Sequence, residues 1–249
     1  MQLYFIRHAQ SENNLLFDLY GNEAHRKPDP TITDTGWKQA KILSEFIRNS
    51  GNGSPEVEID PLNRSGFHFS HIYCSLMIRS IQTGTVLANA MGLPLVALSD
   101  LHEGGGIFRK DEVSGENMPL PGNDLPFFKE NFPHLILPKD INDNGWWNRP
   151  FEDHQQRSLR AVRLLKLLLE THGNSNDRIA LISHGGFYNY FLGEILGCYS
   201  QLESGEIIRR PQVWLTMFNT AITRIDWEDE ETRLVYHNRI DFMPTELIT

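Results

Sequence analysis

An arginine and a histidine stand side by side near the start of the chain, directly after a short apolar run. Residues 3–6 are Leu, Tyr, Phe and Ile, which is typical of a buried strand. Arg7 and His8 follow at the point where such a strand leaves the core. In an open α/β sheet, ligands bind at the carboxyl ends of the strands. Since an arginine can hold phosphate oxygens and a neutral imidazole can attack phosphorus, the pair indicates phosphate chemistry.

Three further polar residues stand just past the ends of other predicted strands: Arg79, Glu103 and His184. Each has an ordinary alternative role, as a surface arginine, a loop carboxylate or a core histidine with satisfied hydrogen bonds. Their common position at strand ends favours a single site. Gly185 and Gly186 follow His184, so the backbone can approach a ligand closely and begin a helix whose N-terminus faces that ligand.

Four segments of the chain resemble, in the same order, the motifs of the histidine phosphatase (phosphoglycerate mutase-like) superfamily. They are Arg-His-Ala-Gln-Ser-Glu-Asn at 7–13, the segment 73–83 around Arg79, Leu-His-Glu at 101–103, and Ser-His-Gly-Gly at 183–186. The family's usual glycine after the first histidine is Ala9 here. Residues 29–36 and 39–40 also match, so the similarity covers most of the chain outside 104–150.

The resemblance implies phosphoryl transfer through a covalent intermediate. His8 would attack phosphorus in line and carry the group as phosphohistidine, which splits one displacement into two easier ones. The attacking ring must be neutral, and the nearby cations Arg7 and Arg79 disfavour an imidazolium. Glu103 would protonate the leaving oxygen and later take a proton from water, with His184 as the third catalytic residue.

The resemblance also implies a phosphate cage that needs no metal. The expected phosphate ligands are Arg7, Asn13, Arg79, His184 and Gly185. Because such a cage can neutralise phosphate, and no metal-spaced His/Asp/Glu cluster is apparent, we expect neither metal nor cofactor. The expected partner is a small-molecule phosphate ester, which the sequence does not identify. Six charged residues could meet its anionic groups or be solvated surface charges: His25, Arg26, Lys27, Arg109, Arg149 and Arg157.

Two other kinds of protein would also carry phosphate-binding residues of these types. A cysteine phosphatase loop has five small or glycine-rich residues between its cysteine and arginine, whereas only four separate Cys74 from Arg79 and several of these are bulky. Cys74 is therefore expected to be a buried strand residue. A non-catalytic phosphate-binding module would need neither a nucleophile nor a proton donor, so the presence of both His8 and Glu103 argues against it.

The residues after Glu103 distinguish two activities within the superfamily. Cofactor-dependent mutases carry Glu-Arg-His-Tyr-Gly at the proton donor, whereas Gly104, Gly105 and Gly106 follow Glu103 here. Glycines have no side chains to hold both ends of a bisphosphate. The sequence therefore favours a phosphatase in which these glycines and a Pro-rich lid form the substrate wall. Mutase-type phosphotransfer is the alternative.

Alternating strands and helices must position these residues. Strands are expected at 3–6, 68–74, 95–98 and 178–183, with possible edge strands at 213–218, 221–226 and 233–236. Helices are expected after Thr33, up to about Met91, at 152–172 and at 187–196, and residues 15–33 are expected to form a loop. This order predicts a single α/β domain over 1–249: three α/β/α layers, a mostly parallel central sheet and an antiparallel edge. Residues 104–152, rich in proline and containing Trp146 and Trp147, are expected to form an inserted lid or subdomain.

Composition limits the remaining possibilities. The net charge of -9 argues against a nucleic-acid or membrane-surface binder, because both need basic faces. Cys74 and Cys198 cannot form a disulfide framework, and no apolar run reaches the ~20 residues of a membrane span. No signal peptide is apparent, so we expect a cytoplasmic protein. The sequence does not decide whether it forms a homo-oligomer.

Overall fold

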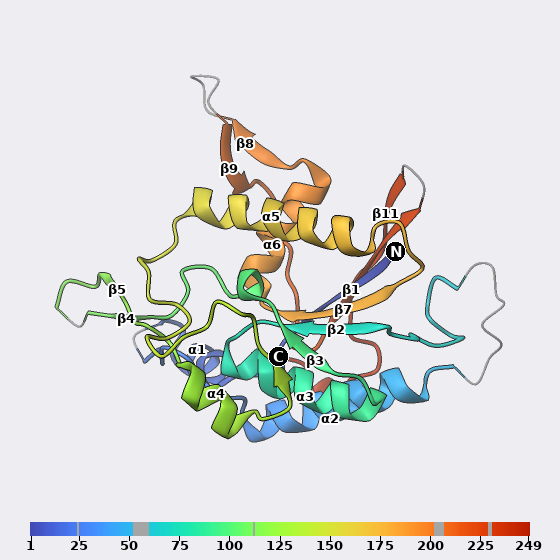
Figure 1. Ribbon diagram of the computed structural model, residues 1–249, viewed down its shortest axis with the longest axis horizontal. Coiled ribbons are helices and arrows are strands. Elements are labelled where there is room, and N and C mark those ends of the chain that lie inside the picture. Colours follow the sequence, from blue (N-terminus) through green and yellow to red (C-terminus); the bar gives the residue numbers. More distant parts are fainter. Residues whose placement is uncertain (24, 52–59, 112, 202–206, 229–230) are drawn as a thin grey trace.

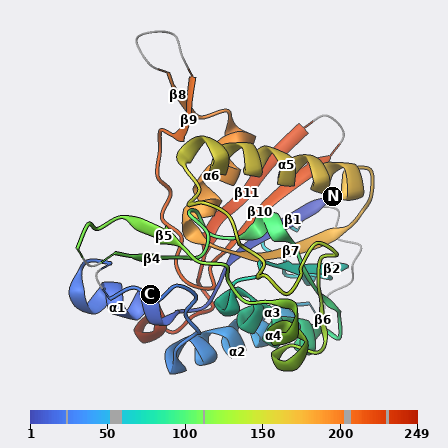
Figure 2. The ribbon, with the colours of Figure 1, turned by 60° about the vertical axis from the view of Figure 1, so that its left-hand side comes forward.

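A mixed seven-stranded sheet forms the centre of the molecule in the computed structural model, which describes residues 1–23, 25–51, 60–111, 113–201, 207–228 and 231–249. The strand order is β11-β10-β1-β7-β2-β3-β6 (Figures 1 and 2). The strands are β1 (Gln2–Arg7), β2 (His71–Cys74), β3 (Leu95–Ala97), β6 (Leu135–Ile136), β7 (Arg178–Ser183), β10 (Ile222–Glu228) and β11 (Glu231–Arg239). The run from β1 to β6 is parallel, and β10 and β11 add an antiparallel edge. The predicted α/β class and sheet type are therefore confirmed.

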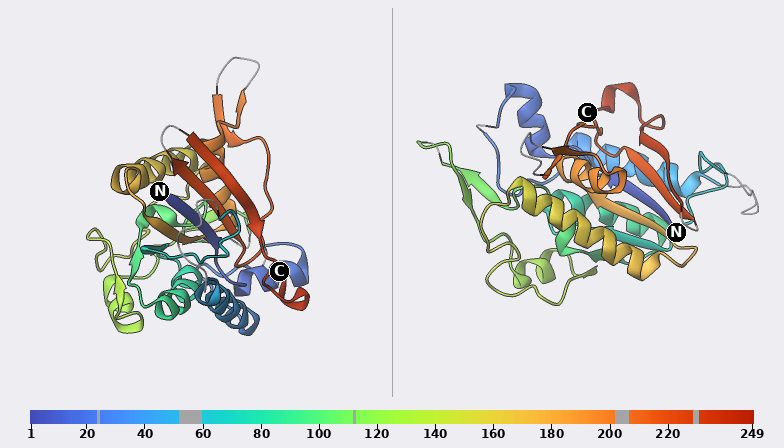
Figure 3. Two further views of the ribbon diagram at one scale, coloured as in Figure 1. Left: turned by 90° about the vertical axis from the view of Figure 1, so that its right-hand side faces the viewer. Right: turned by 90° about the horizontal axis from the view of Figure 1, so that it is seen from above.

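Helices cover both faces of this sheet (Figures 1 and 3). Strand β1 shows why: Tyr4 and Ile6 belong to one buried cluster, and Leu3 and Phe5 belong to another on the opposite face. The first cluster packs against α2 (Asp34–Asn49) and α3 (Ile78–Met91), and the second against α5 (His154–His172) and α6 (Gly185–Leu196). Two-sided burial explains the uninterrupted apolar character of the central strands.

The predicted helix starts depend on capping side chains. Thr33 accepts a hydrogen bond from the Gly36 amide at 3.0 Å and begins α2, as the sequence indicates. Asp153 begins α5 through a capping box with Gln156. In both helices the buried residues recur at three- and four-residue spacing, which places one apolar face against the sheet.

Two segments differ from the sequence prediction. Helix α1 (Glu12–Tyr20) lies within the stretch predicted as a loop, and Ser11 caps it with Asn14. It has no buried residue, so it lacks the apolar periodicity by which a helix is recognised. Residues 213–218 form no strand, although their apolar alternation suggested one. They form an irregular segment instead, and residues 214–217 of this segment line the cavity of the functional site.

Residues 104–152 contain a hairpin of β4 (Phe108–Lys110) and β5 (Asn117–Pro119), then α4 (Leu125–Asn131), then β6. Strand β6 pairs with β3 at the edge of the central sheet, and Phe128 of α4 is fully buried in the main core. A second hairpin, β8 (Tyr199–Gln201) with β9 (Ile207–Pro211), extends beyond α6 (Figure 2). Among the described helices, none combines the length and apolar character that crossing a membrane requires.

Candidate functional site

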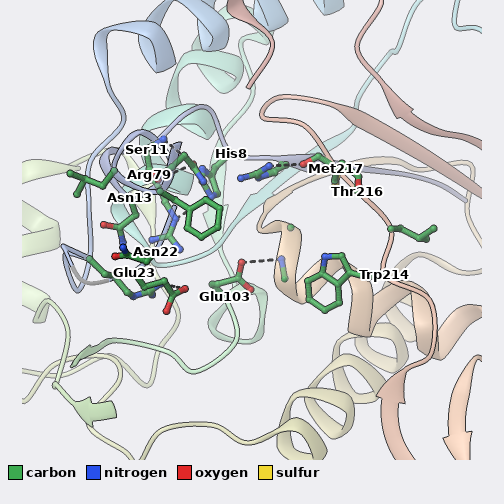
Figure 4. Close-up of a pocket in the computed structure, with 18 residues that line it drawn as sticks. His8, Ser11, Asn13, Asn22, Glu23, Arg79, Glu103, Trp214, Thr216 and Met217 are labelled. Atoms are coloured by element: carbon green, nitrogen blue, oxygen red, sulfur yellow. Dashed lines mark hydrogen bonds and ion pairs between the residues drawn. The ribbon is translucent and has the colours of Figure 1, made fainter. Parts of the chain in front are cut away.

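The carboxyl ends of β1 and β7 bring the two predicted histidines together. These strands are parallel neighbours, and the His8 amide donates to the Ser183 carbonyl at 2.9 Å. The His8 and His184 ring centroids lie 5.1 Å apart. A cavity of about 350 Å³ opens above them (Figure 4). Its lining includes these predicted site residues: Arg7, His8, Asn13, Arg79, Glu103 and Gly185.

The hydrogen bonds of His8 define its tautomer. Its Nδ1 lies 2.7 Å from the Ala9 carbonyl oxygen, which can only accept, so Nδ1 carries the proton. Nε2 therefore holds the free electron pair, and it accepts from Arg79 Nε at 3.1 Å. Burial, followed by the charges of Arg79 and Arg7, holds the pKa of His8 well below its usual range. The ring is thus neutral and has a nucleophilic nitrogen at neutral pH.

Backbone contacts fix the segment that carries His8. Asn219 Nδ2 donates to the His8 carbonyl at 2.7 Å, and the Ala9 amide donates to Thr83 Oγ1 at 3.0 Å. Ala9 is fully buried and does not have a positive φ, so alanine fits without strain where the family usually has glycine. None of these supporting residues was assigned a role from the sequence, because their contacts join distant parts of the chain.

Three buried N–H-bearing nitrogens on residues next to His8 have no hydrogen-bond partner in the described part of the chain. They are Arg7 Nε, Arg79 Nη1 and His184 Nδ1. Arg7 and Arg79 line the cavity, and His184 packs against His8 without lining it. Arg7 is anchored through Nη1, which donates to the Met217 carbonyl. Buried donors without acceptors are costly, and native proteins rarely keep them without a functional reason. The site therefore has the donors to receive an anion with several oxygens.

Ser75 orients His184 and was not singled out from the sequence. Its Oγ lies 2.7 Å from His184 Nε2 and accepts from the Met77 amide at 3.2 Å. Among the described residues, Ser75 Oγ contacts no other acceptor for its hydroxyl proton, so we assign that proton to a bond with Nε2, and a neutral His184 then carries its own proton on Nδ1. Burial, then Arg79 and His8, lowers the pKa of His184 well below its usual range. His184 is thus a neutral ring with a free Nδ1–H donor.

Asp29 supports Arg79 and was also missed. Its Oδ1 accepts from the Ile78 amide at 3.1 Å and lies 3.8 Å from Arg79 Nη1. Its Oδ2 accepts from Asn123 Nδ2 at 3.2 Å. Burial raises the pKa of Asp29 to about 6, and Arg79 opposes that rise. The available signal was its place in the matched segment 29–36, which by itself says nothing of an ion pair with α3.

Glu103 is held at the N-terminus of α6 by backbone amides. Its Oε1 accepts from Phe187 N and Gly104 N at 2.7 Å each, and its Oε2 accepts from Gly186 N at 3.0 Å. The helix N-terminus expected to face the phosphate is therefore occupied by this carboxylate in the structure, a favourable position for negative charge. Figure 4 shows Glu103 across the cavity from His8, where it can meet the leaving-group side of a bound ester.

We expect Gly186→Ala to impair catalysis by displacing Glu103. A Cβ at Gly186 would lie 2.5 Å from Glu103 Oε1, so the carboxylate must move away from the helix N-terminus. Turnover of an alkyl phosphate should fall by about 10²-fold, within the usual contribution of a positioned acid. Gly193→Ala in the same helix is the control, because its Cβ would meet nothing closer than 3.8 Å. Equal rates for the two variants would show that Glu103 does not need this position.

Asn13 and most of the six charged residues considered for substrate contacts are less directly positioned to bind a ligand than Arg7 or Arg79. Asn13 lines the cavity, but both ends of its side-chain amide bond the backbone of Lys27, at 2.8 Å each. It therefore ties the loop after α1 to that helix in the unliganded structure. Of the six charged residues considered for substrate contacts, Arg26 lines the cavity and the other five do not.

The three glycines after Glu103 do not form the expected cavity wall. They are absent from the cavity lining, and a Cβ at Gly106 would lie 2.1 Å from the Trp147 ring. A Cβ at Gly105 would lie 2.4 Å from the Phe151 ring, and both glycines have positive φ, at +77° and +88°. Gly105 and Gly106 thus let the chain turn beneath these aromatic side chains, and their presence does not discriminate between phosphatase and mutase.

A group of metal-capable side chains does exist among the described residues, contrary to the sequence expectation. His71, His172 and Asp177 bring one ligand atom each within 4.8 Å of one another. His71 begins β2, Asp177 directly precedes β7 and His172 ends α5, so the group lies at the opposite end of the parallel strands from His8. His172 Nδ1 donates to Asp177 Oδ2 at 2.7 Å, and its Nε2 bonds the Tyr73 hydroxyl at 3.0 Å. This hydrogen-bond network satisfies His172 without an ion.

Comparison with known proteins shows similarity to phosphatases of one superfamily. The profile of the histidine phosphatase superfamily (branch 1) matches residues 122–240. A protein of Hydrogenobacter thermophilus, provisionally named phosphoserine phosphatase 2, is 24% identical over 245 residues, which cover 96% of each chain.

Solved structures share the fold over nearly the whole chain. A phosphoserine phosphatase variant from Entamoeba histolytica, bound to phosphoserine, has a TM-score of 0.58 and 17% identity, and covers 98% of this chain and 99% of its own. A mycobacterial glucosyl-3-phosphoglycerate phosphatase complexed with VO3 has a TM-score of 0.58 and 15% identity, covering 95% and 98%. At these identities the likeness establishes the fold.

Proposed function

We propose that the chain is a member of the histidine phosphatase superfamily and a phosphomonoester hydrolase that acts through a phosphohistidine on His8 and needs no metal. The observation that supports it most strongly is the set of unpartnered buried donors on Arg7, Arg79 and His184 beside a neutral imidazole. A dianionic phosphoryl group supplies the acceptors that these donors lack.

In the first step, the phosphoryl group of the ester binds between Arg7 and Arg79. The phosphate oxygens take over the donors of Arg79, including the Nε–H that bonds His8 in the unliganded structure, so the His8 electron pair becomes available. Nε2 attacks phosphorus, the P–N bond forms and the P–O bond to the leaving group breaks. Glu103, protonated at the end of the preceding cycle by the attacking water, gives that proton to the leaving oxygen, which departs as an alcohol.

In the second step, water attacks the phosphoryl group on His8. Glu103, now ionised, takes a proton from that water, the P–N bond breaks and inorganic phosphate is released. The His8 Nδ1–H bond to the Ala9 carbonyl stabilises the ring orientation in both steps. The sum is ester plus water giving alcohol plus phosphate, and the cationic cage neutralises charge where metal ions do so in other phosphotransferases.

The test is a comparison of hydrolysis and transfer. The enzyme is incubated with a panel of phosphomonoesters, with and without a chelator, and separately with 3-phosphoglycerate and a bisphosphoglycerate primer. We expect phosphate release from several esters, unaffected by the chelator, and little isomerisation. Primer-dependent isomerisation much faster than any hydrolysis would replace the hydrolase proposal with mutase-type phosphotransfer. Chelator-sensitive release restored by a divalent ion would contradict metal independence.

A further inference from the structure

Arg26 brings a second set of unused donors to the same cavity. Its side chain is 14% exposed, and it lines the cavity together with His8 and Arg79. Among the described residues, Arg26 Nε and Nη2 are buried and have no hydrogen-bond partner. Nη1 lies 3.9 Å from Glu23 Oε1, beyond hydrogen-bond distance. The unsatisfied edge of this guanidinium is therefore the one formed by Nε and Nη2.

The same edge holds a carboxylate at two other places in this protein. Arg160 Nε and Nη2 each donate to one oxygen of Glu152 at 2.7 Å. Arg224 Nε and Nη2 donate to the two oxygens of Asp226, at 2.8 and 2.6 Å. The spacing of these two nitrogens matches the two oxygens of a carboxylate, so the arrangement is bidentate. At Arg26 the matching edge is present, and the described residues offer it no carboxylate.

Packing fixes the orientation of Arg26 before any ligand arrives. Its guanidinium carbon lies 4.2 Å from the centroid of the Phe108 ring, and Phe108 packs edge-on against Phe151 at 4.9 Å. Burial lowers the pKa of Arg26, while Glu23, Glu103 and Asp29 raise it. The group thus stays cationic at neutral pH and is pre-oriented, which reduces the entropy lost on binding.

Arg26 enters the cavity from a different part of the chain than the proposed phosphoryl ligands. It comes from the loop after α1, whereas the phosphoryl ligands Arg7 and Arg79 come from β1 and α3. Its neighbour Glu23 lies with Asn22 at the edge of the cavity opposite Thr216 and Met217 (Figure 4). The cavity of about 350 Å³ has room for a small ester that spans from His8 to this edge.

We propose that Arg26 is a carboxylate subsite, so that the preferred substrates are small phosphomonoesters whose leaving group carries a carboxylate. The proposal rests on the proposed hydrolase function for its catalytic consequence, but not for binding. The matched probes are 3-phosphoglycerate and glycerol 3-phosphate, which differ in a carboxylate against a hydroxymethyl group. Arg26→Met removes the charge and donors while keeping a side chain that can pack on Phe108.

Binding is measured first, by calorimetry in the His8→Ala background, where neither ester turns over. We expect 3-phosphoglycerate to bind tighter than glycerol 3-phosphate, and Arg26→Met to weaken it by about 10- to 100-fold, as for a charge-assisted hydrogen bond. Glycerol 3-phosphate should change by less than about threefold. Arg109→Met, an exposed arginine of β4 outside the cavity lining, should change neither. In the active enzyme, kcat/KM should show the same selective loss.

Three results would overturn the carboxylate subsite. Equal affinity of the His8→Ala protein for the two esters would show that the site does not recognise the carboxylate. An equal loss for both in Arg26→Met would assign Arg26 to the transferred phosphoryl group or to the fold, and no loss for either would leave it without a ligand. Selective binding without hydrolysis of either ester by the native enzyme would instead contradict the proposed function and support the subsite.

Discussion

Replacing His8 with alanine is expected to lower kcat/KM for every phosphomonoester by on the order of 10⁴-fold or more. The reason is the loss of His8 Nε2, a nitrogen that combines an electron pair, a neutral ring and a position against the Arg79 guanidinium. No neighbouring group can replace it. The Cys74 thiol is fully buried in β2, and burial raises its pKa, so the thiolate that a cysteine phosphatase needs does not form.

The control for this variant is His134→Ala, which removes an exposed imidazole. It should retain full activity. Circular dichroism and thermal unfolding establish that the His8→Ala protein is folded, and added imidazole should restore part of its turnover by occupying the vacated space as an external nucleophile. Retention of turnover within about tenfold of the native rate in His8→Ala would exclude His8 as the nucleophile.

The second large effect is expected for Glu103→Gln, and its size should depend on the leaving group. Glycerol 3-phosphate has a poor leaving group that needs a proton, so its turnover should fall by about 10²–10⁴-fold. 4-Nitrophenyl phosphate leaves as a stable phenolate and should be affected far less. The amide keeps an oxygen that can accept from the Phe187 or Gly186 amide, so the variant tests proton transfer more than position.

Glu116→Gln provides the matched control, because Glu116 is exposed and stands outside the cavity lining. Both rates should be unchanged in that variant. If Glu103→Gln slows the alkyl and the aryl ester to the same degree, Glu103 acts by holding the N-terminus of α6 in place and another group delivers the proton.

Most of the central fold could be predicted from the sequence, because burial on both faces leaves a clear pattern. Strand β7 is an unbroken apolar run, and α2 shows both a capping threonine and periodic apolar residues. Helix α1 could not be predicted, since none of its residues is buried and even the Phe17 side chain is 54% exposed. The predicted strand at 213–218 is wrong, since residues 214–217 line the cavity as an irregular segment.

The residues of the site also include some that the sequence predicts and some that it does not. Arg7, His8, Arg79, Glu103 and His184 could be placed because each follows the end of a predicted strand, and the parallel sheet brings those ends together. Asp29 was assigned no role from the sequence, and Arg26 could not be distinguished from five other charged residues, because burial sets both apart. Asp29 meets Ile78 across 49 residues of sequence, and Arg26 stacks on a ring of the segment 104–152. A charged residue in a loop normally indicates a solvated surface, and only the packing reveals otherwise.

The most direct test of covalent catalysis by His8 is to trap the phosphoenzyme. The native enzyme is mixed with a ³²P-labelled phosphomonoester, quenched within a turnover in alkaline denaturant, and digested for mass spectrometry. We predict one phosphoryl group per chain, stable in base and labile in acid, on the peptide that carries His8 and absent from the His8→Ala protein. A label on His184 or Cys74, or continuing turnover with no covalent label at any quench time, would contradict a phosphohistidine at His8.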